Sequence, residues 1–230
     1  MQTDLRTNLE SVRAQIRNAA SRAGRNVDEI KLVAVSKMHP SSTISDAISA
    51  GQTFFGENKV QEGEGKIIEI GRNDAEWHLI GHLQSNKARK AVQLFDVIHS
   101  VDSVDIAMRL ERICIEEDRQ TLSVFAQVDL AGEDTKSGIP ESELAELATY
   151  LRSCDRLKFD GLMILPPYFE NPDDVRPFFK RLREIRDDLF SPGKGELSMG
   201  MSHDFEIAIE EGSTVVRVGT AIFGERSGYE

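Results

Sequence analysis

The sequence is poor in cysteine, with two in 230 residues, and it has one tryptophan and three tyrosines. Two thiols, Cys114 and Cys154, in a chain of this length indicate a reducing compartment rather than a disulfide-stabilised secreted protein. Residues 1–16 contain no apolar segment like that of a secretory signal peptide. No stretch approaches the roughly 18 apolar residues that a membrane-spanning helix needs. We therefore expect a cytoplasmic protein that does not associate with a membrane.

Positive charge is also scarce in this chain. It has 28 Lys and Arg against 39 Asp and Glu, which gives a net charge of −11 at pH 7. No run of Lys and Arg interrupts this acidic field, and nucleic-acid affinity depends on neutralising phosphates with such residues. We therefore expect no nucleic-acid partner. Hydrophobic residues make up 40% of the chain, which is enough for a large folded core.

Several catalytic and ligand-binding motifs are missing. The sequence has no G-x-G-x-x-G and no G-x-S-x-G. Its Gly65-Lys66 pair lacks the upstream glycine of a phosphate-binding loop, and Ile67 replaces the Ser or Thr that such a loop requires. The histidines have no metal-ligand spacing, so we expect no metal site. They are His39, His78, His82, His99 and His203, of which His82 is the best candidate for a role in a site.

The apolar residues alternate between two periodicities along the chain. Leu5–Ala23 has helical spacing and is followed by Gly24, which is well placed to end a helix. Short apolar runs, typical of buried parallel strands, lie at Ile30–Val35, Thr53–Phe55, Trp77–Ile80, Val97–His99, Leu122–Val128, Phe159–Leu165, Glu196–Met199 and Thr214–Val218. Amphipathic stretches of helical period separate them, at Ser42–Ala50, Lys59–Ile70, Ser85–Phe95, Val104–Glu117, Glu141–Leu151, Val175–Leu189 and Phe205–Glu211.

This alternation of strands and helices predicts a parallel sheet, either closed as a barrel or open and doubly wound. Eight β units favour the barrel, and 230 residues is close to the usual barrel length of about 250 residues. We therefore predict an α/β fold with a single (β/α)8 TIM-type barrel domain over residues 1–230. An extra N-terminal helix, within residues 1–25, should pack on this barrel.

Reactive side chains follow several of the expected strands, where functional groups of parallel α/β folds gather. Lys37 directly follows the first strand, so its side chain should point along or into the barrel mouth. A partly desolvated lysine loses its charge readily and becomes an amine nucleophile toward aldehydes. Position alone leaves a solvated lysine at a strand end as an equal alternative.

The segment Thr214–Gly224 predicts a strand, then Gly219-Thr220, then a short helical turn. Backbone N–H groups at such a turn form a phosphate site, and phosphate sites recur after the seventh and eighth strands of barrels. Ser202 and Thr220 could add hydroxyl donors. Arg217 lies inside an otherwise apolar strand, where a guanidinium needs a specific acceptor. The alternative is a glycine that simply permits the turn.

Seven motifs, spread over nearly the whole chain, make up a more specific pattern. They are Val33–Lys37, Phe55–Asn58, Ile80–Lys87, Lys136–Gly138, Gly161–Met163, Leu197–Ser202 and Val216–Gly224. Together they resemble the pyridoxal phosphate homeostasis proteins (YggS/PROSC type), whose barrel is similar to the N-terminal domain of alanine racemase. The resemblance implies the same fold and pyridoxal 5′-phosphate (PLP) as the cofactor.

The resemblance also implies roles for individual residues. Lys37 would hold PLP as a Schiff base, and Arg217 would lie at the pyridine nitrogen. Ser202 and the turn at Gly219 and Thr220 would lie at the phosphate.

Three further residues, Asn58, His82 and Met199, would line the cofactor by their position in the motifs. The function that the resemblance implies is a carrier or buffer in PLP homeostasis, without strong catalytic activity. Its expected partners are PLP and the apo-enzymes that receive it, and we expect a monomer.

Two other functions stay open, a PLP-dependent amino-acid racemase or lyase and a cofactor-free Schiff-base aldolase. Arg217 argues against the first, because a permanent cation at the ring nitrogen weakens the ring as an electron sink. Racemases of this class also use a tyrosine from a second domain, which we expect to be absent from a chain ending at Glu230. Tyr168 is then the plausible substitute base. The phosphate turn and Arg217 argue against the aldolase.

Overall fold

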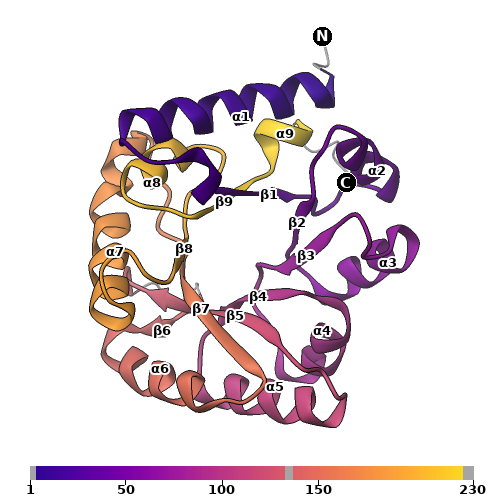
Figure 1. Cartoon of the computed structure of the whole chain (residues 1–230), viewed down its shortest axis with the longest axis vertical. Coiled ribbons are helices and arrows are strands. Elements are labelled where there is room, and N and C mark those ends of the chain that lie inside the picture. Colours follow the sequence, from indigo (N-terminus) through magenta and orange to yellow (C-terminus); the bar gives the residue numbers. More distant parts are fainter. Residues whose placement is uncertain (1–3, 133–136, 225–230) are drawn as a thin grey trace.

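Eight parallel strands form a closed barrel at the centre of the molecule, surrounded by helices (Figure 1). The computed structural model describes residues 4–132 and 137–224. The barrel strands are β1 Lys31–Val35, β2 Phe54–Glu57, β3 Glu76–Leu79, β4 Val97–Val101, β5 Leu122–Asp129, β7 Leu157–Ile164, β8 Glu196–Ser198 and β9 Val215–Val218. A further short strand, β6 at Ile139–Pro140, pairs in parallel with the end of β5.

The barrel closes because its first and last strands pair with each other. β1 lies between β2 and β9, and its Lys31 and Val33 pair with Val215 and Arg217 of β9. On the other side of the ring β4 pairs with β5, so the order is β1, β2, β3, β4, β5, β7, β8, β9 and back to β1. The predicted (β/α)8 barrel is therefore confirmed, and the open doubly wound sheet is excluded.

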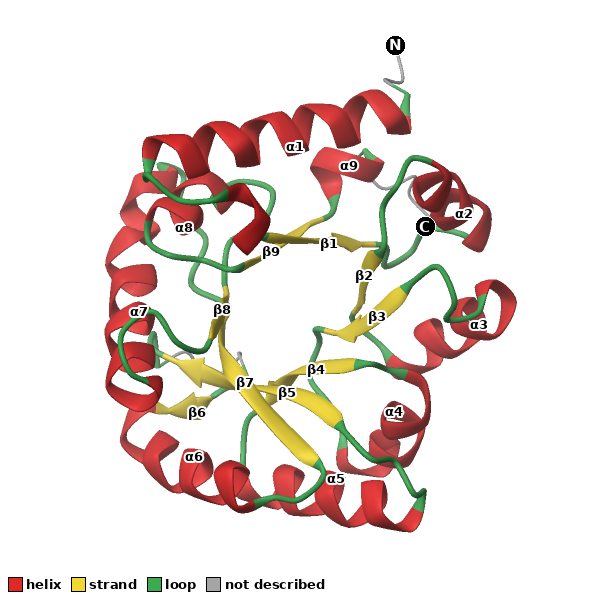
Figure 2. Ribbon diagram, in the orientation of Figure 1, coloured by secondary structure: helices red, strands yellow, loops and turns green. Residues whose placement is uncertain are grey.

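Helices lie outside the ring of strands (Figure 2). They are α1 Leu5–Arg22, α2 Ser41–Ser49, α3 Val60–Ile70, α4 Ala88–Leu94, α5 Val104–Glu116, α6 Leu144–Ser153, α7 Arg176–Phe190, α8 Phe205–Glu210 and α9 Thr220–Phe223. Short 3₁₀ turns lie at Val27–Glu29, Ser85–Lys87, Glu141–Glu143 and Pro172–Val175. Within the described part of the chain, no helix combines the length and apolar character needed to cross a membrane.

Alternation of side chains along the strands produces two separate apolar cores. In β9, Val216 and Val218 belong to the large core between strands and helices, whereas Val215 belongs to a small inner core. The other buried members of the inner core are Val33, Val97, Phe125 and Met163. Arg217 lies two residues after Val215, and alternate residues of a strand point to the same side. The charged side chain of Arg217 therefore points inside the barrel.

The strands and helices expected from the sequence are all present, with boundaries that differ by a few residues. The second strand runs to Glu57 rather than ending at Phe55. The helix expected at Ser85–Phe95 begins as a 3₁₀ turn and becomes α-helical at Ala88. Strand β6 has no counterpart in the sequence prediction, because two residues are too few to show an alternation.

The N-terminal helix α1 packs against α8 and α9. Asn8 Nδ2 donates to the carbonyl oxygen of Ile222 in α9 at 3.0 Å. Arg22 forms ion pairs of 2.9 Å with Glu206 and Glu210 of α8. Helix α1 therefore supports α9, the short helix that follows the last barrel strand.

Candidate functional site

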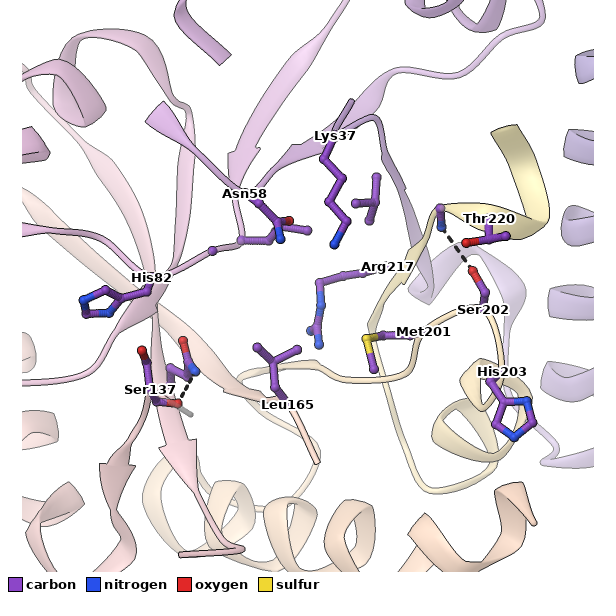
Figure 3. A pocket seen from close by; sticks show the side chains of 15 residues that line it. Lys37, Asn58, His82, Ser137, Leu165, Met201, Ser202, His203, Arg217 and Thr220 are labelled. Atoms are coloured by element: carbon purple, nitrogen blue, oxygen red, sulfur yellow. Dashed lines mark hydrogen bonds between the residues drawn. The ribbon is translucent and has the colours of Figure 1, made fainter. Parts of the chain in front are cut away.

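A cavity of about 500 Å³ lies at the carboxyl ends of the strands (Figure 3). Its walls come from the residues that follow most of the barrel strands, as the parallel architecture predicts. They are Val35, Lys37, Asn58, Ile80, Gly81, His82, Gln127, Ser137, Leu165, Met201, Ser202, His203, Arg217, Gly219 and Thr220. The structure thus brings together every site residue proposed from the sequence except Met199.

Lys37 reaches into the cavity from the turn that follows β1. Its neighbour Ser36 is fully buried, and Met38 has a left-handed backbone with φ of 66°. Figure 3 shows the amine end of Lys37 inside the cavity, on the same side as Asn58 and above Arg217. The turn therefore directs the lysine into the barrel mouth, as expected from its place after an apolar strand.

A buried ionic cluster holds this turn in place. Lys66 Nζ donates to Ser36 O at 2.8 Å, to Glu57 Oε1 at 2.8 Å and to Glu62 Oε1 at 2.7 Å. Ser36 Oγ also donates to Glu57 Oε1, and the Met38 N–H donates to Glu62. Burial raises the pKa of Glu57, an effect that Lys66 partly offsets. The sequence gives no local signal for this cluster, because Lys66 lies in an amphipathic stretch like that of a surface helix.

The adjoining wall is formed by the turn after β9, the strand that pairs with β1, and by the loop after β8. The Gly219 N–H donates to Ser202 Oγ at 3.2 Å, which joins the two segments. Helix α9 begins at Thr220, so the first amides of this helix have no carbonyl partner within the helix. In Figure 3 Ser202 and Thr220 lie together at one end of the cavity. This end offers hydroxyl and backbone donors of the kind that bind phosphate.

Arg217 forms the floor of the cavity. Its Nη1 donates to Ser198 Oγ at 2.5 Å and its Nη2 to Ile164 O at 2.9 Å. Burial lowers the pKa of Arg217 to about 10, an effect that Asp204 opposes. The guanidinium is therefore still charged at neutral pH. Ser198 Oγ and the Ile164 carbonyl oxygen are the specific acceptors expected for an arginine inside an apolar strand.

The remaining wall carries Asn58 and His82. Gly81 packs so closely on the loop after β2 that a Cβ atom there would lie 2.2 Å from Asn58 O, so only glycine fits. His82 Nδ1 lies 3.1 Å from Asp102 Oδ2, and burial raises the pKa of Asp102. Figure 3 shows the His82 ring turned away from the centre of the cavity.

Met199 does not line the cavity, and the expectation that it would is wrong. Its side chain is fully buried in the large core between strands and helices. Because side chains alternate along a strand, Met199 points outward like Leu197, whereas Ser198 between them faces the inside of the barrel. Met201, two residues later in the loop, lines the cavity instead. Tyr168 also lies outside the lining: its residue is 75% exposed and its ring packs on His203 at 5.2 Å between centroids.

Three polar residues of the wall, Gln127, Ser137 and His203, were not proposed from the sequence. Gln127 is buried on β5, and its Nε2 donates to the Ser137 carbonyl oxygen. Its Oε1 is buried with no hydrogen-bond partner among the described residues. The motif residue Lys136 lies outside the described residues. A polar residue inside an otherwise apolar strand is the feature that singled out Arg217, and the same feature could have identified Gln127.

Comparisons with known proteins show which family the chain belongs to. The family model described as alanine racemase, N-terminal domain, matches residues 7–227. The pyridoxal phosphate homeostasis protein of Aquifex aeolicus is 42% identical over 221 residues, which are 95% of this chain and 96% of that protein. The protein of the same name from Escherichia coli K12 is 44% identical over 233 residues and 97% of each chain.

Solved structures extend the comparison. PipY of Synechococcus elongatus, solved with PLP bound, is 38% identical and superposes with a TM-score of 0.82, over 96% of this chain and all of that chain. Alanine racemase of Corynebacterium glutamicum shares only the fold, at 16% identity and a TM-score of 0.65, with 62% of its length covered. This chain therefore belongs to the pyridoxal phosphate homeostasis proteins, a family built on the barrel of the alanine racemase N-terminal domain.

Proposed function

We propose that this protein binds PLP covalently at Lys37 and acts in PLP homeostasis, as a carrier that keeps the reactive aldehyde bound. One observation carries the proposal: a strand-end lysine, a donor-rich turn and a buried arginine all line the same cavity. PipY, at 38% identity, was solved with PLP.

The cavity fits each part of PLP. The Ser202 hydroxyl and the amides at Thr220 suit a phosphate at one end. Arg217 has N–H donors beyond those given to Ser198 and Ile164, and such a donor suits an unprotonated ring nitrogen. Lys37 supplies the amine that bonds to the aldehyde carbon. Asn58, Leu165 and Met201 would then lie along the ring.

The same residues favour binding over catalysis. Bound PLP supplies an electron sink for amino-acid chemistry. Arg217 opposes protonation of the ring nitrogen and so weakens that sink. Two-base racemisation needs a second base across from Lys37, within hydrogen-bond reach of the substrate proton. Tyr168 is too far out on the surface to be that base, and the His82 ring points away. We therefore propose a non-catalytic protein, rather than a racemase or lyase.

We further propose that the protein is a cytoplasmic monomer and delivers PLP to apo-enzymes. Cys114 and Cys154 are both free thiols, in keeping with a reducing compartment. Met38 and Met201 are exposed beside the cavity, at 58% and 37%. Such flexible apolar side chains at the rim suit contact with more than one acceptor.

Borohydride reduction of the protein with PLP, followed by peptide mass spectrometry, tests this function. We expect the visible band of bound PLP to bleach and a single adduct to appear on Lys37. Lys37→Ala should lose the adduct and keep its circular dichroism spectrum, because the side chain lies at the barrel rim. Lys59→Ala, at an exposed lysine beside Asn58, is the matched control. A wild-type protein that stays colourless with PLP, or an adduct on another lysine, would disprove the proposal.

A further inference from the structure

A chain of buried polar side chains runs through the inside of the barrel, below the cavity. Arg217 Nη1 donates to Ser198 Oγ at 2.5 Å. Ser198 Oγ lies 2.8 Å from His99 Nδ1, and His99 Nε2 lies 2.7 Å from His78 Nδ1. His78 Nε2 lies 3.1 Å from Glu76 Oε1, within ion-pair distance, although this nitrogen has no hydrogen-bond partner among the described residues. The chain thus links the cavity floor to the beginning of β3, where Glu76 is partly exposed.

The chemistry of its two ends decides which group donates at each step of this hydrogen-bonded series. An arginine can only donate and a carboxylate can only accept. Ser198 therefore accepts from Arg217 and turns its own hydrogen toward His99 Nδ1. His99 then carries its proton on Nε2 and donates to His78 Nδ1, and His78 carries its proton on Nε2, facing Glu76. The reverse order would place an unprotonated His78 nitrogen against the carboxylate and leave the Ser198 hydrogen without an acceptor in the chain.

Packing holds both imidazoles in this arrangement. His99 is fully buried and His78 is 2% exposed. The His99 ring stacks on Phe125 with centroids 4.4 Å apart and an interplanar angle of 8°, and the edge of Phe54 meets His78 at 6.0 Å. Burial, with repulsion from the Arg217 cation, lowers the pKa of His99 well below its ordinary value. His99 therefore stays neutral and keeps one donor and one acceptor nitrogen.

We propose that Ser198, His99, His78 and Glu76 are positioning residues that fix the guanidinium plane of Arg217 toward the cofactor ring. The Ser198 hydrogen is committed to His99, so its oxygen presents a lone pair to Arg217. Together with Ile164 O, this acceptor ties two nitrogens of the guanidinium and leaves the other N–H groups in a defined direction. The proposal rests on the proposed function, because it concerns how the site meets the ring nitrogen of PLP.

Nitrogen-15 NMR of the histidine rings tests the proton order in the PLP-free protein. We expect His78 and His99 both to carry hydrogen on Nε2, and His99 to take up no second proton across the neutral pH range. A hydrogen on Nδ1 of His99 would overturn the proposal, since Ser198 would then have to accept from both sides. This measurement does not depend on cofactor binding, so it stands even if the proposed function fails.

Two substitutions of His99 separate its two contacts. His99→Asn keeps an acceptor near the Nδ1 position, whereas His99→Gln keeps an amide near Nε2 and loses the contact to Ser198. The probe is pyridoxine 5′-phosphate, which has no aldehyde and so binds without a bond to Lys37. We expect His99→Gln to weaken its binding about tenfold, the scale of one charge-assisted hydrogen bond, and His99→Asn to bind nearly as wild type. Equal binding by both variants would overturn the proposal.

Ser198→Ala provides a second route with a matched control. It removes the acceptor of Arg217, so pyridoxine 5′-phosphate should again bind about tenfold more weakly. It should also shift the visible band of bound PLP. Ser100→Ala removes another buried hydroxyl, one that has no hydrogen-bond partner among the described residues, and should change neither. A Ser198→Ala protein that matches Ser100→Ala refutes the positioning role. If wild type binds neither pyridoxine 5′-phosphate nor PLP, the proposed function itself is wrong.

Discussion

Replacing Lys66 with methionine removes the cation that holds the Lys37 turn. Lys66 Nζ makes three hydrogen bonds, to Ser36 O, Glu57 Oε1 and Glu62 Oε1. Glu57 is fully buried, and its Oε2 already has no hydrogen-bond partner among the described residues. Without Lys66 the Glu57 carboxylate would be buried with no neighbouring cation in the cluster.

The expected loss of folding stability in Lys66→Met follows from the isolated charge on Glu57. Removing one partner of a buried ion pair destabilises a protein by about 3–5 kcal/mol. The exposed pair of Lys90 and Glu64, at 2.6 Å, provides a matched control. Because exposed pairs contribute about 0–1 kcal/mol, Lys90→Met should cost less than about 1 kcal/mol. The double variant Lys66→Met/Glu57→Gln should regain part of the loss, since it removes the uncompensated charge.

The loss of folding stability in Lys66→Met should be smaller at low pH. Burial already raises the pKa of Glu57 above its ordinary value of 4.5, and loss of Lys66 raises it further. The folded variant therefore holds a proton that the unfolded chain releases above about pH 4.5, and its stability falls as the pH rises from there through the raised pKa. Lys66→Met should thus be closer to wild type at pH 5 than at pH 7.

Urea unfolding followed by circular dichroism measures these differences. Bond formation with PLP should also weaken in Lys66→Met, because the cluster contacts the residues on both sides of Lys37. The reasoning is refuted if Lys66→Met costs no more than Lys90→Met. It is also refuted if its cost grows on going from pH 7 to pH 5.

Three further predictions concern the barrel interior and the cavity. His99, whose burial lowers its pKa well below the ordinary 6.5, should make the protein less stable in acid. The unfolded chain takes up a proton below that pH and the folded chain does not, which costs at most about 1.4 kcal/mol per pH unit. His99→Asn should show a shallower pH dependence in urea titrations, and an unchanged slope would contradict the buried neutral imidazole. Arg217→Glu should shift the visible band of bound PLP and weaken binding, because a carboxylate favours a protonated ring nitrogen; an unchanged spectrum would mean that Arg217 does not face the ring. Assays on common amino acids should detect no racemase, transaminase or decarboxylase turnover near the usual enzyme range of about 1–1000 per second. Such a turnover, lost in Tyr168→Phe, would replace the carrier function with an enzymatic one.

The sequence by itself determined the barrel and the approximate positions of its strands. Strand and helix periods are local patterns, and eight alternating units suffice to predict a closed parallel barrel. The same local reasoning placed Lys37 after the first strand and Arg217 inside the last one. A residue's distance from a strand end decides whether it reaches the mouth of a barrel, so these positions needed no knowledge of tertiary contacts.

Only the tertiary structure decided which side chains meet. Met201 rather than Met199 lines the cavity, because the parity of β8 carries Met199 into the outer core. His99 meets Ser198 across 99 positions of sequence, and the sequence had indicated only that this histidine is no metal ligand. Lys66 belongs to an amphipathic stretch that resembles any other surface helix. Contacts of this kind depend on how strands and helices distant in the chain register against each other, and a local period carries no information about that register.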